Sequence, residues 1–136
     1  MTALIRVKKE FPKCVAIEEY FVTLINDNIY KWKAVCKPNT DVFKKEYVFE
    51  ITIPTNYPFS APAVLCKTSI FHPNIDSNGK ICSTLLTEWD PKYTIYTILT
   101  TILDLFREPN TENPVNLKAA ELWSNKKAYT ERLNMC

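Results

Sequence analysis

Hydrophobic and polar positions divide the chain into a strand-rich first half and a helical second half. Residues 2–11 have the spacing of a short amphipathic helix, which Pro12 is expected to end. Asn26-Asp27-Asn28 predicts a hairpin turn between the first two strands. The β-branched and aromatic segments that predict strands are residues 20–25, 29–36, 47–53 and 64–66. Because short connections join them in sequence, they predict an antiparallel meander.

The second half of the chain has helical spacing. In residues 94–106 apolar side chains recur at i, i+3, i+4 and i+7, which indicates a helix with one buried face. Asn113-Pro114 is expected to cap a helix over residues 115–123, and Ser124 to cap a last helix over residues 125–134. The whole pattern predicts an α+β fold with an N-terminal helix, a four-stranded antiparallel sheet, an ordered loop and C-terminal helices.

Residues 71–91, between the two halves, show no regular periodicity. A loop of this length in a small domain usually has a function or is disordered. Its many apolar side chains favour an ordered loop, so functional residues are expected here.

Composition narrows the class of protein. The 136 residues fit a single domain over residues 1–136, and the net charge of +2 argues against nucleic acid as the main partner. No apolar run approaches the roughly 18 residues of a membrane span. Five cysteines without a CxxC pair, and one histidine, argue against a metal site. Free thiols favour a reducing compartment, the cytoplasm or the nucleus.

The loop contains one cysteine whose neighbours suggest chemistry. Asn78-Gly79 predicts a tight turn, because glycine tolerates positive φ and asparagine tolerates it better than most residues. The turn would bring Cys82 alongside Asn74. A thiol can form a covalent acyl intermediate, and an amide N–H can stabilise the oxyanion formed when that intermediate is attacked. Cys14, Cys36 and Cys66 are expected in the core.

His72-Pro73-Asn74, with a cysteine eight residues after the asparagine, resembles the active site of ubiquitin-conjugating enzymes. The resemblance extends from about Trp32 to Leu133. It includes, in the same order, the segments Tyr57–Pro62, Trp89–Pro91 and Glu108–Pro114. Further fragments resemble the neddylation branch most, which conjugates the modifier Nedd/Rub, chiefly to cullins. These fragments are Phe11–Cys14, Val35–Pro38, Val64–Thr68, Phe106–Asn110 and Asn116–Glu121.

The resemblance implies a role for each matching residue. Cys82 would accept the modifier from an activating enzyme as a thioester and pass it to a target lysine, while Asn74 stabilises the oxyanion. His72 would organise the loop, and Asp76 and Asn113 would form the environment of the acceptor lysine. Many family members have aspartate or serine where this chain has Asn113. The activating enzyme consumes ATP, and no cofactor is expected on this chain.

A RING-type ligase is the remaining partner that the resemblance implies. Its docking surface would comprise Phe59, Pro91, Arg6 and Lys9. Phe59 supports this, since an exposed phenylalanine between prolines is expected to be covered by a partner.

Three alternatives stay open at this point. Ubiquitin itself could be the modifier in place of Nedd/Rub. The chain could be a non-catalytic scaffold that binds a modifier. It could also be a thiol hydrolase, with Cys82 as nucleophile, His72 as base and Asn74 as orienting residue. The position of His72 directly before Pro73 in the same loop argues against the hydrolase.

Overall fold

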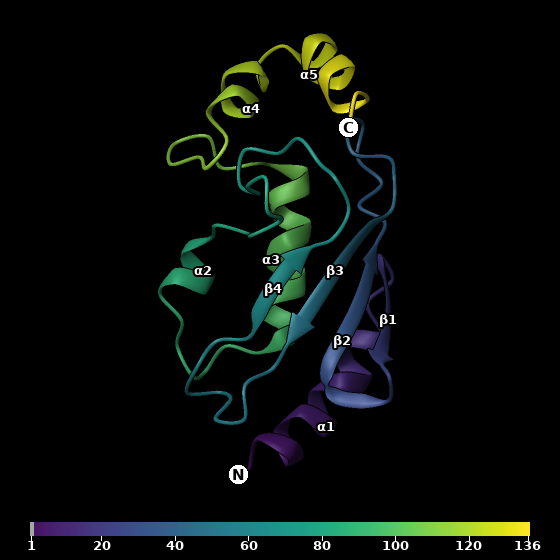
Figure 1. The fold of residues 1–136 in the computed structure, drawn as a ribbon, viewed down its shortest axis with the longest axis vertical. Coiled ribbons are helices and arrows are strands. Elements are labelled where there is room, and N and C mark those ends of the chain that lie inside the picture. The colour runs from purple at the N-terminus through teal and green to yellow at the C-terminus, as the bar shows by residue number, and fades with distance from the viewer. Residues whose placement is uncertain (1) are drawn as a thin grey trace.

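The computed structural model describes residues 2–136 and confirms the predicted α+β fold. Helix α1 lies at one end of the molecule, α4 and α5 lie at the other, and the sheet lies between them (Figure 1). The strands are antiparallel and adjacent in chain order, β1-β2-β3-β4, so the predicted meander is correct. The elements are α1 Ala3–Val15, β1 Tyr20–Ile25, β2 Asn28–Cys36, β3 Tyr47–Thr52, β4 Ala63–Cys66, α2 Thr84–Thr87, α3 Ile95–Arg107, α4 Leu117–Leu122 and α5 Lys126–Leu133.

The first hairpin turn forms without glycine. Asn26 and Asp27 both have positive φ, 52° and 57°, which is the two-residue geometry that matches the twist of antiparallel strands. Asparagine and aspartate tolerate this region because their short polar side chains can hydrogen-bond locally. The turn was predicted, but Asn28 belongs to β2 rather than to the turn.

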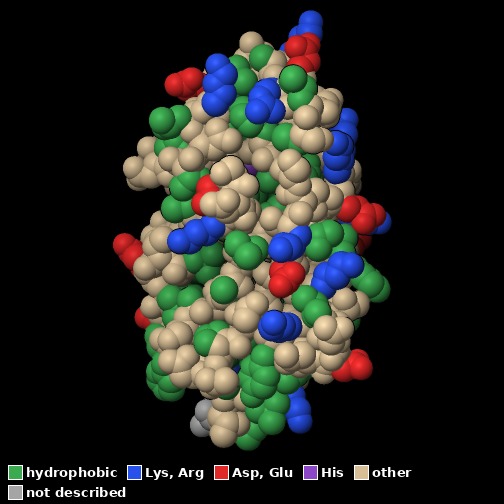
Figure 2. Space-filling model, viewed as in Figure 1, with side chains coloured by type: hydrophobic (Ala, Val, Ile, Leu, Met, Phe, Trp, Pro, Cys, Tyr) green, Lys and Arg blue, Asp and Glu red, His purple; other side chains and the backbone are tan. Residues whose placement is uncertain are grey.

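The main core lies between one face of the sheet and α3, which crosses behind strands β3 and β4 (Figure 1). Along β2 exposed and buried side chains alternate: Lys31 and Lys33 are exposed, while Trp32 and Ala34 are buried. The predicted stripe of α3 is buried: Ile95, Ile98, Leu99, Ile102, Leu103 and Phe106. On the outside, lysine and arginine side chains are interspersed with acidic ones over the face shown in Figure 2.

An aromatic cluster, part of the same core, joins the C-terminal helices to the sheet. The Phe43 ring lies at its centre, with centroids 5.1 Å from Phe106, 5.2 Å from His72, and 6.0 Å from both Trp123 and Tyr129. Edge and stacked contacts of this kind stabilise beyond the area that they bury. The cluster therefore fixes the functional loop, through His72, to both α3 and the C-terminal helices.

Some predicted boundaries are wrong. Pro12 does not end the first helix, which continues to Val15 because Cys14 is fully buried on the same face as Val7. Packing thus offsets the hydrogen bond that the proline lacks. The four-residue helix α2, which Ser83 caps, was not predicted.

The last two helices begin later than predicted. Asn116, not Asn113, caps α4, because the N–H groups of Val115 and Asn116 are already donated to the Pro73 carbonyl. Asn125, rather than Ser124, caps α5 through the Ala128 N–H.

Candidate active site

The loop that carries Cys82 closes through a turn built around Asp76. Its carboxylate accepts the backbone N–H groups of Asn78 and Lys80, both at 2.9 Å. Its backbone N–H donates to the Lys80 carbonyl at 3.0 Å, and its carbonyl accepts the Gly79 N–H at 3.0 Å. The two arms of the turn then run antiparallel, as the pair Ile75–Ile81 shows. The Asp76 carboxylate is therefore part of the turn's own structure.

Glycine is the only residue type that fits at position 79. It has φ of +84°, and a Cβ built on it would lie 2.1 Å from the carbonyl oxygen of Cys66. The close approach of the two backbones allows a hydrogen bond, in which the Cys66 N–H donates to the Gly79 carbonyl at 2.7 Å. The turn is thereby attached to the end of strand β4.

Cys82 lies beside Asn74, as predicted from the turn at Asn78-Gly79. The Cys82 N–H donates to the Asn74 carbonyl at 2.9 Å. Its thiol is free and half-buried. Three other thiols differ: burial raises the pKa of Cys14 and Cys36 to about 12 and that of Cys66 to about 11. These three are core residues, as predicted, and are held protonated. Reactive thiols need access, which favours Cys82 over the three core cysteines.

The side chain of Asn74 is turned toward Asn110 rather than toward solvent. Its Nδ2 donates to the Asn110 carbonyl at 2.8 Å, and its Oδ1 accepts the Asn110 N–H at 2.9 Å. The residue is 2% exposed. This reciprocal pair, with the Pro73 contacts described above, attaches the 110–116 segment to the loop. Asn113 lies in that segment and is exposed.

His72 is fully buried, and both of its ring nitrogens are engaged. Nδ1 accepts the Asn74 N–H at 2.9 Å, so Nε2 carries the proton and donates it to the Leu105 carbonyl at 2.9 Å. Burial lowers its pKa to about 4, which leaves the ring neutral at pH 7. The imidazole therefore joins the loop to α3. It has no free nitrogen to act as a base for Cys82, which contradicts the thiol hydrolase alternative.

The residues predicted for ligase docking lie on α1 and two loops. Phe59 is 76% exposed, and Pro91 and Lys9 are exposed. Arg6 differs, because its guanidinium is turned inward onto Glu10 and the 91–93 loop. Glu10 was not predicted as a site residue, although its i,i+4 spacing from Arg6 is that of a helical ion pair.

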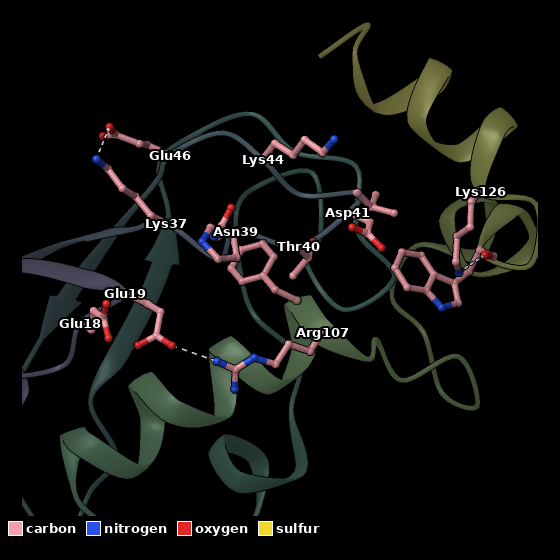
Figure 3. Close-up of a pocket in the computed structure, with 14 residues that line it drawn as sticks. Glu18, Glu19, Lys37, Asn39, Thr40, Asp41, Lys44, Glu46, Arg107 and Lys126 are labelled. Atoms are coloured by element: carbon pink, nitrogen blue, oxygen red, sulfur yellow. Dashed lines mark hydrogen bonds and ion pairs between the residues drawn. The ribbon is translucent and has the colours of Figure 1, made fainter.

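A cavity of about 960 Å³ lies away from Cys82, which is not among its lining residues. Residues 37–46, the end of α3 and the start of α5 line it (Figure 3). Two ion pairs lie within its wall, Lys37 with Glu46 at 3.4 Å and Arg107 with Glu19 at 3.0 Å. Within residues 2–136, no three His, Cys, Asp or Glu side chains are grouped to hold a metal ion. None of the described helices is long and apolar enough to cross a membrane.

Fold and site define a class of protein: an α+β domain that presents one accessible thiol on a rigid loop next to a buried asparagine. Comparison with known proteins agrees. The family model described as ubiquitin-conjugating enzyme matches residues 6–136, so the chain belongs to the ubiquitin-conjugating enzyme family.

Two relatives are similar over most of the chain. One is named Ubiquitin-conjugating enzyme E2-20 kDa, from Schizosaccharomyces pombe, and is 34% identical over 81% of this chain and 64% of its own length. The other is named Ubiquitin conjugating enzyme E2 B, from Dictyostelium discoideum, and is 39% identical over 72% of this chain and 68% of its own length. The matched part thus spans about two thirds of each relative.

Proposed function

We propose that residues 1–136 form the catalytic core domain of a conjugating enzyme that carries ubiquitin as a thioester on Cys82. The observation that carries the proposal is the position of Cys82. In a chain of this family, it is a half-buried free thiol that a backbone hydrogen bond holds beside Asn74. The names of both relatives support ubiquitin as the modifier. Nedd/Rub, with cullins as targets, becomes the alternative, since neither name refers to it.

The reaction consists of two acyl transfers. In the first, the Cys82 thiolate attacks the thioester that links the modifier's C-terminal carbonyl to the activating enzyme, and that enzyme's thiol leaves. ATP is consumed upstream, when the activating enzyme forms its own thioester. In the second, a lysine amine attacks the Cys82 thioester, a C–N bond forms, the C–S bond breaks and the amine loses a proton. Each attack passes through a tetrahedral oxyanion.

We assign stabilisation of that oxyanion to Asn74. Its amide is committed to Asn110, so the role requires the side chain to exchange the Asn110 carbonyl for the oxyanion. His72 positions the Asn74 backbone from the inside of the loop. Asp76 and Asn113 are proposed to surround the acceptor lysine. Asn113 carries no charge there, so desolvation of the amine would be the main way to lower the lysine pKa.

Loading distinguishes the enzyme from a non-catalytic scaffold. The chain is incubated with activating enzyme, ATP and either ubiquitin or Nedd/Rub in parallel reactions. We expect an adduct with ubiquitin that reductant removes, and a reductant-resistant ester in Cys82→Ser. Cys136→Ser, which alters the exposed cysteine outside the loop, is the matched control and loads normally. An adduct with Nedd/Rub alone would return the assignment to neddylation, and no adduct with either modifier would favour the scaffold.

The ligase surface is assigned to Phe59, Pro91, Lys9 and the helix turn that contains Arg6. The 76% exposure of Phe59 supports the assignment, because an aromatic side chain in this position is a typical anchor for a partner. The protein is proposed to act in the cytoplasm or the nucleus, where free thiols persist.

A further inference from the structure

One buried carboxylate, Glu10, connects three segments that are far apart in sequence. It is 6% exposed. The Tyr57 hydroxyl donates to its two oxygens at 2.8 and 2.7 Å, and the Ile95 N–H at the start of α3 donates at 2.7 Å. Arg6 Nε donates at 3.0 Å from one turn earlier on α1. The charge is therefore buried with an ion-pair partner and full hydrogen bonding, as a stable buried carboxylate requires.

Arg6 extends this network to the surface. Its Nη2 donates to the carbonyls of Pro91 at 3.0 Å and Tyr93 at 2.7 Å. Its guanidinium also lies 5.2 Å from the centre of the Tyr57 ring. Only a planar fork of donors can serve Glu10 and the two carbonyls at once, so the ion pair also orients the 91–93 loop.

The connected segments are those that carry the proposed ligase surface. Phe59 follows Tyr57 by two residues, and Lys9 directly precedes Glu10. The loop that contains Phe59 and the loop that contains Pro91 also contact each other directly, since Trp89 Nε1 donates to the Pro58 carbonyl at 2.7 Å. Glu10→Gln would leave Arg6 without its counter-ion and would replace one of the two acceptor oxygens shared by α1, the Tyr57 loop and α3 with an amide donor.

We propose that Glu10 is a positioning residue for ligase docking, an inference that rests on the proposed function. Its carboxylate sets the relative placement of Phe59, Pro91 and Lys9, and it touches neither the modifier nor the thioester. Ligase affinity then depends on Glu10, whereas transfer from Cys82 to free lysine does not.

The test compares Glu10→Gln with the wild-type chain after loading. Discharge to free lysine is measured in a single turnover at increasing concentrations of a RING domain, chosen from a purified panel as one that stimulates the wild type. We expect the half-saturating RING concentration to rise about tenfold, with the maximum and unstimulated rates unchanged. Glu19→Gln is the matched control, since it removes the carboxylate of another ion pair, 3.0 Å from Arg107 at the opposite end of α3.

A second readout tests positioning directly. The N–H groups of Phe59 and Tyr93 donate to the carbonyls of Asn56 and Asp90 within their own loops. Their hydrogen exchange should accelerate in Glu10→Gln and stay unchanged in Glu19→Gln. The effects of Glu10→Gln and Phe59→Ala on RING affinity should also be less than additive, because Glu10 acts through the contact that Phe59 makes.

The outcomes separate the inference from the function beneath it. If no RING domain stimulates discharge, or if Phe59→Ala leaves RING affinity unchanged, the docking surface is wrong and the inference falls with it. Suppose that Phe59→Ala does weaken RING binding. The inference alone is then overturned if Glu10→Gln leaves RING affinity unchanged, if its effect on RING affinity adds fully to that of Phe59→Ala, or if it slows unstimulated discharge as much as stimulated discharge. Should Glu10→Gln not fold, Tyr57→Phe, which removes a hydrogen-bond donor from Glu10 and lies outside the docking surface, must weaken RING binding without changing unstimulated discharge.

Discussion

The loop of Cys82 and the proposed ligase surface are held in place by different chemistry. The loop of Cys82 is held by hydrogen bonds and close packing: the Asp76 carboxylate accepts N–H groups of its own turn, Gly79 packs against a carbonyl, His72 is neutral, and the amide of Asn74 pairs with Asn110. At the other region a buried ion pair, Glu10 with Arg6, gathers the segments. The contacts around Cys82 are therefore sensitive to a change in side-chain size or hydrogen bonding, whereas the ion pair of Glu10 and Arg6 is sensitive to a loss of charge. Substitutions in the two regions should therefore fail in different ways.

The largest effect is expected at Gly79. Gly79→Ala adds a Cβ 2.1 Å from the Cys66 carbonyl at a φ of +84°, so the turn must move. We expect a loss of roughly 3 kcal/mol or more in the free energy of unfolding. Urea denaturation gives the stability, and a thioester assay should show strongly reduced loading of Cys82. Ser77→Ala, at an exposed position of the same turn, is the control. Wild-type stability in Gly79→Ala would contradict the close packing.

Asn74 should separate catalysis from structure. Asn74→Ala leaves the Asn110 N–H without its acceptor and removes the oxyanion donor. We expect discharge to lysine to fall about 100- to 1000-fold and stability to fall by about 1–3 kcal/mol. Asn74→Asp keeps an acceptor for the Asn110 N–H but sets a carboxylate oxygen against the Asn110 carbonyl, so it should be no more stable than Asn74→Ala and equally slow. A fast Asn74→Asp variant in single-turnover discharge would exclude the oxyanion role.

The neutral state of His72 makes stability depend on pH. Its pKa is about 4 in the folded chain against an ordinary value of 6.5, so the unfolded chain binds the proton more tightly between these values. The stabilisation from neutral His72 is therefore present above pH 6.5 and is lost as pH falls toward 4. Between pH 7 and pH 5 the loss is about 2 kcal/mol.

His72→Asn tests this, because it removes the only histidine in the chain. Urea denaturation at the two pH values should show a drop smaller by about 2 kcal/mol in the variant than in the wild type. An equal drop in both proteins would show that His72 is not the titrating group.

The smallest effect is expected at the edge of the ion pair. Tyr57→Phe removes one hydroxyl donor from Glu10 and keeps the ring against Arg6. We expect a loss of about 1 kcal/mol in the free energy of unfolding and normal loading of Cys82. Tyr96→Phe, at a half-exposed site on α3, is the control and should change little. Impaired loading by Tyr57→Phe would show that the two regions are coupled.

Much of the fold could be predicted from local patterns. The β1 bounds agree with the prediction, and the buried stripe of α3 was found from its spacing alone. The errors occur where tertiary contacts outweigh local signals. Pro12 stays helical because Cys14 is buried. Asn113 does not cap α4, because the following N–H groups bind Pro73.

The candidate site divides in the same way. The sequence predicted the turn at Asn78-Gly79 and the place of Cys82 beside Asn74, because turn residues act over a few positions. It could not predict that the Asn74 side chain binds Asn110, 36 residues away, or that Arg6 points inward. Those contacts form only when distant segments pack together.

By itself, the sequence determined the order of helices and strands, the single glycine turn and the one cysteine that this turn presents. These follow from backbone preferences and hydrophobic spacing, which are local properties. Only the tertiary structure decided that His72 is neutral, that Asn74 is committed to Asn110 and that Glu10 is buried among three segments. The reason is physical: protonation, amide pairing and a buried charge depend on desolvation and on partners far away in the chain.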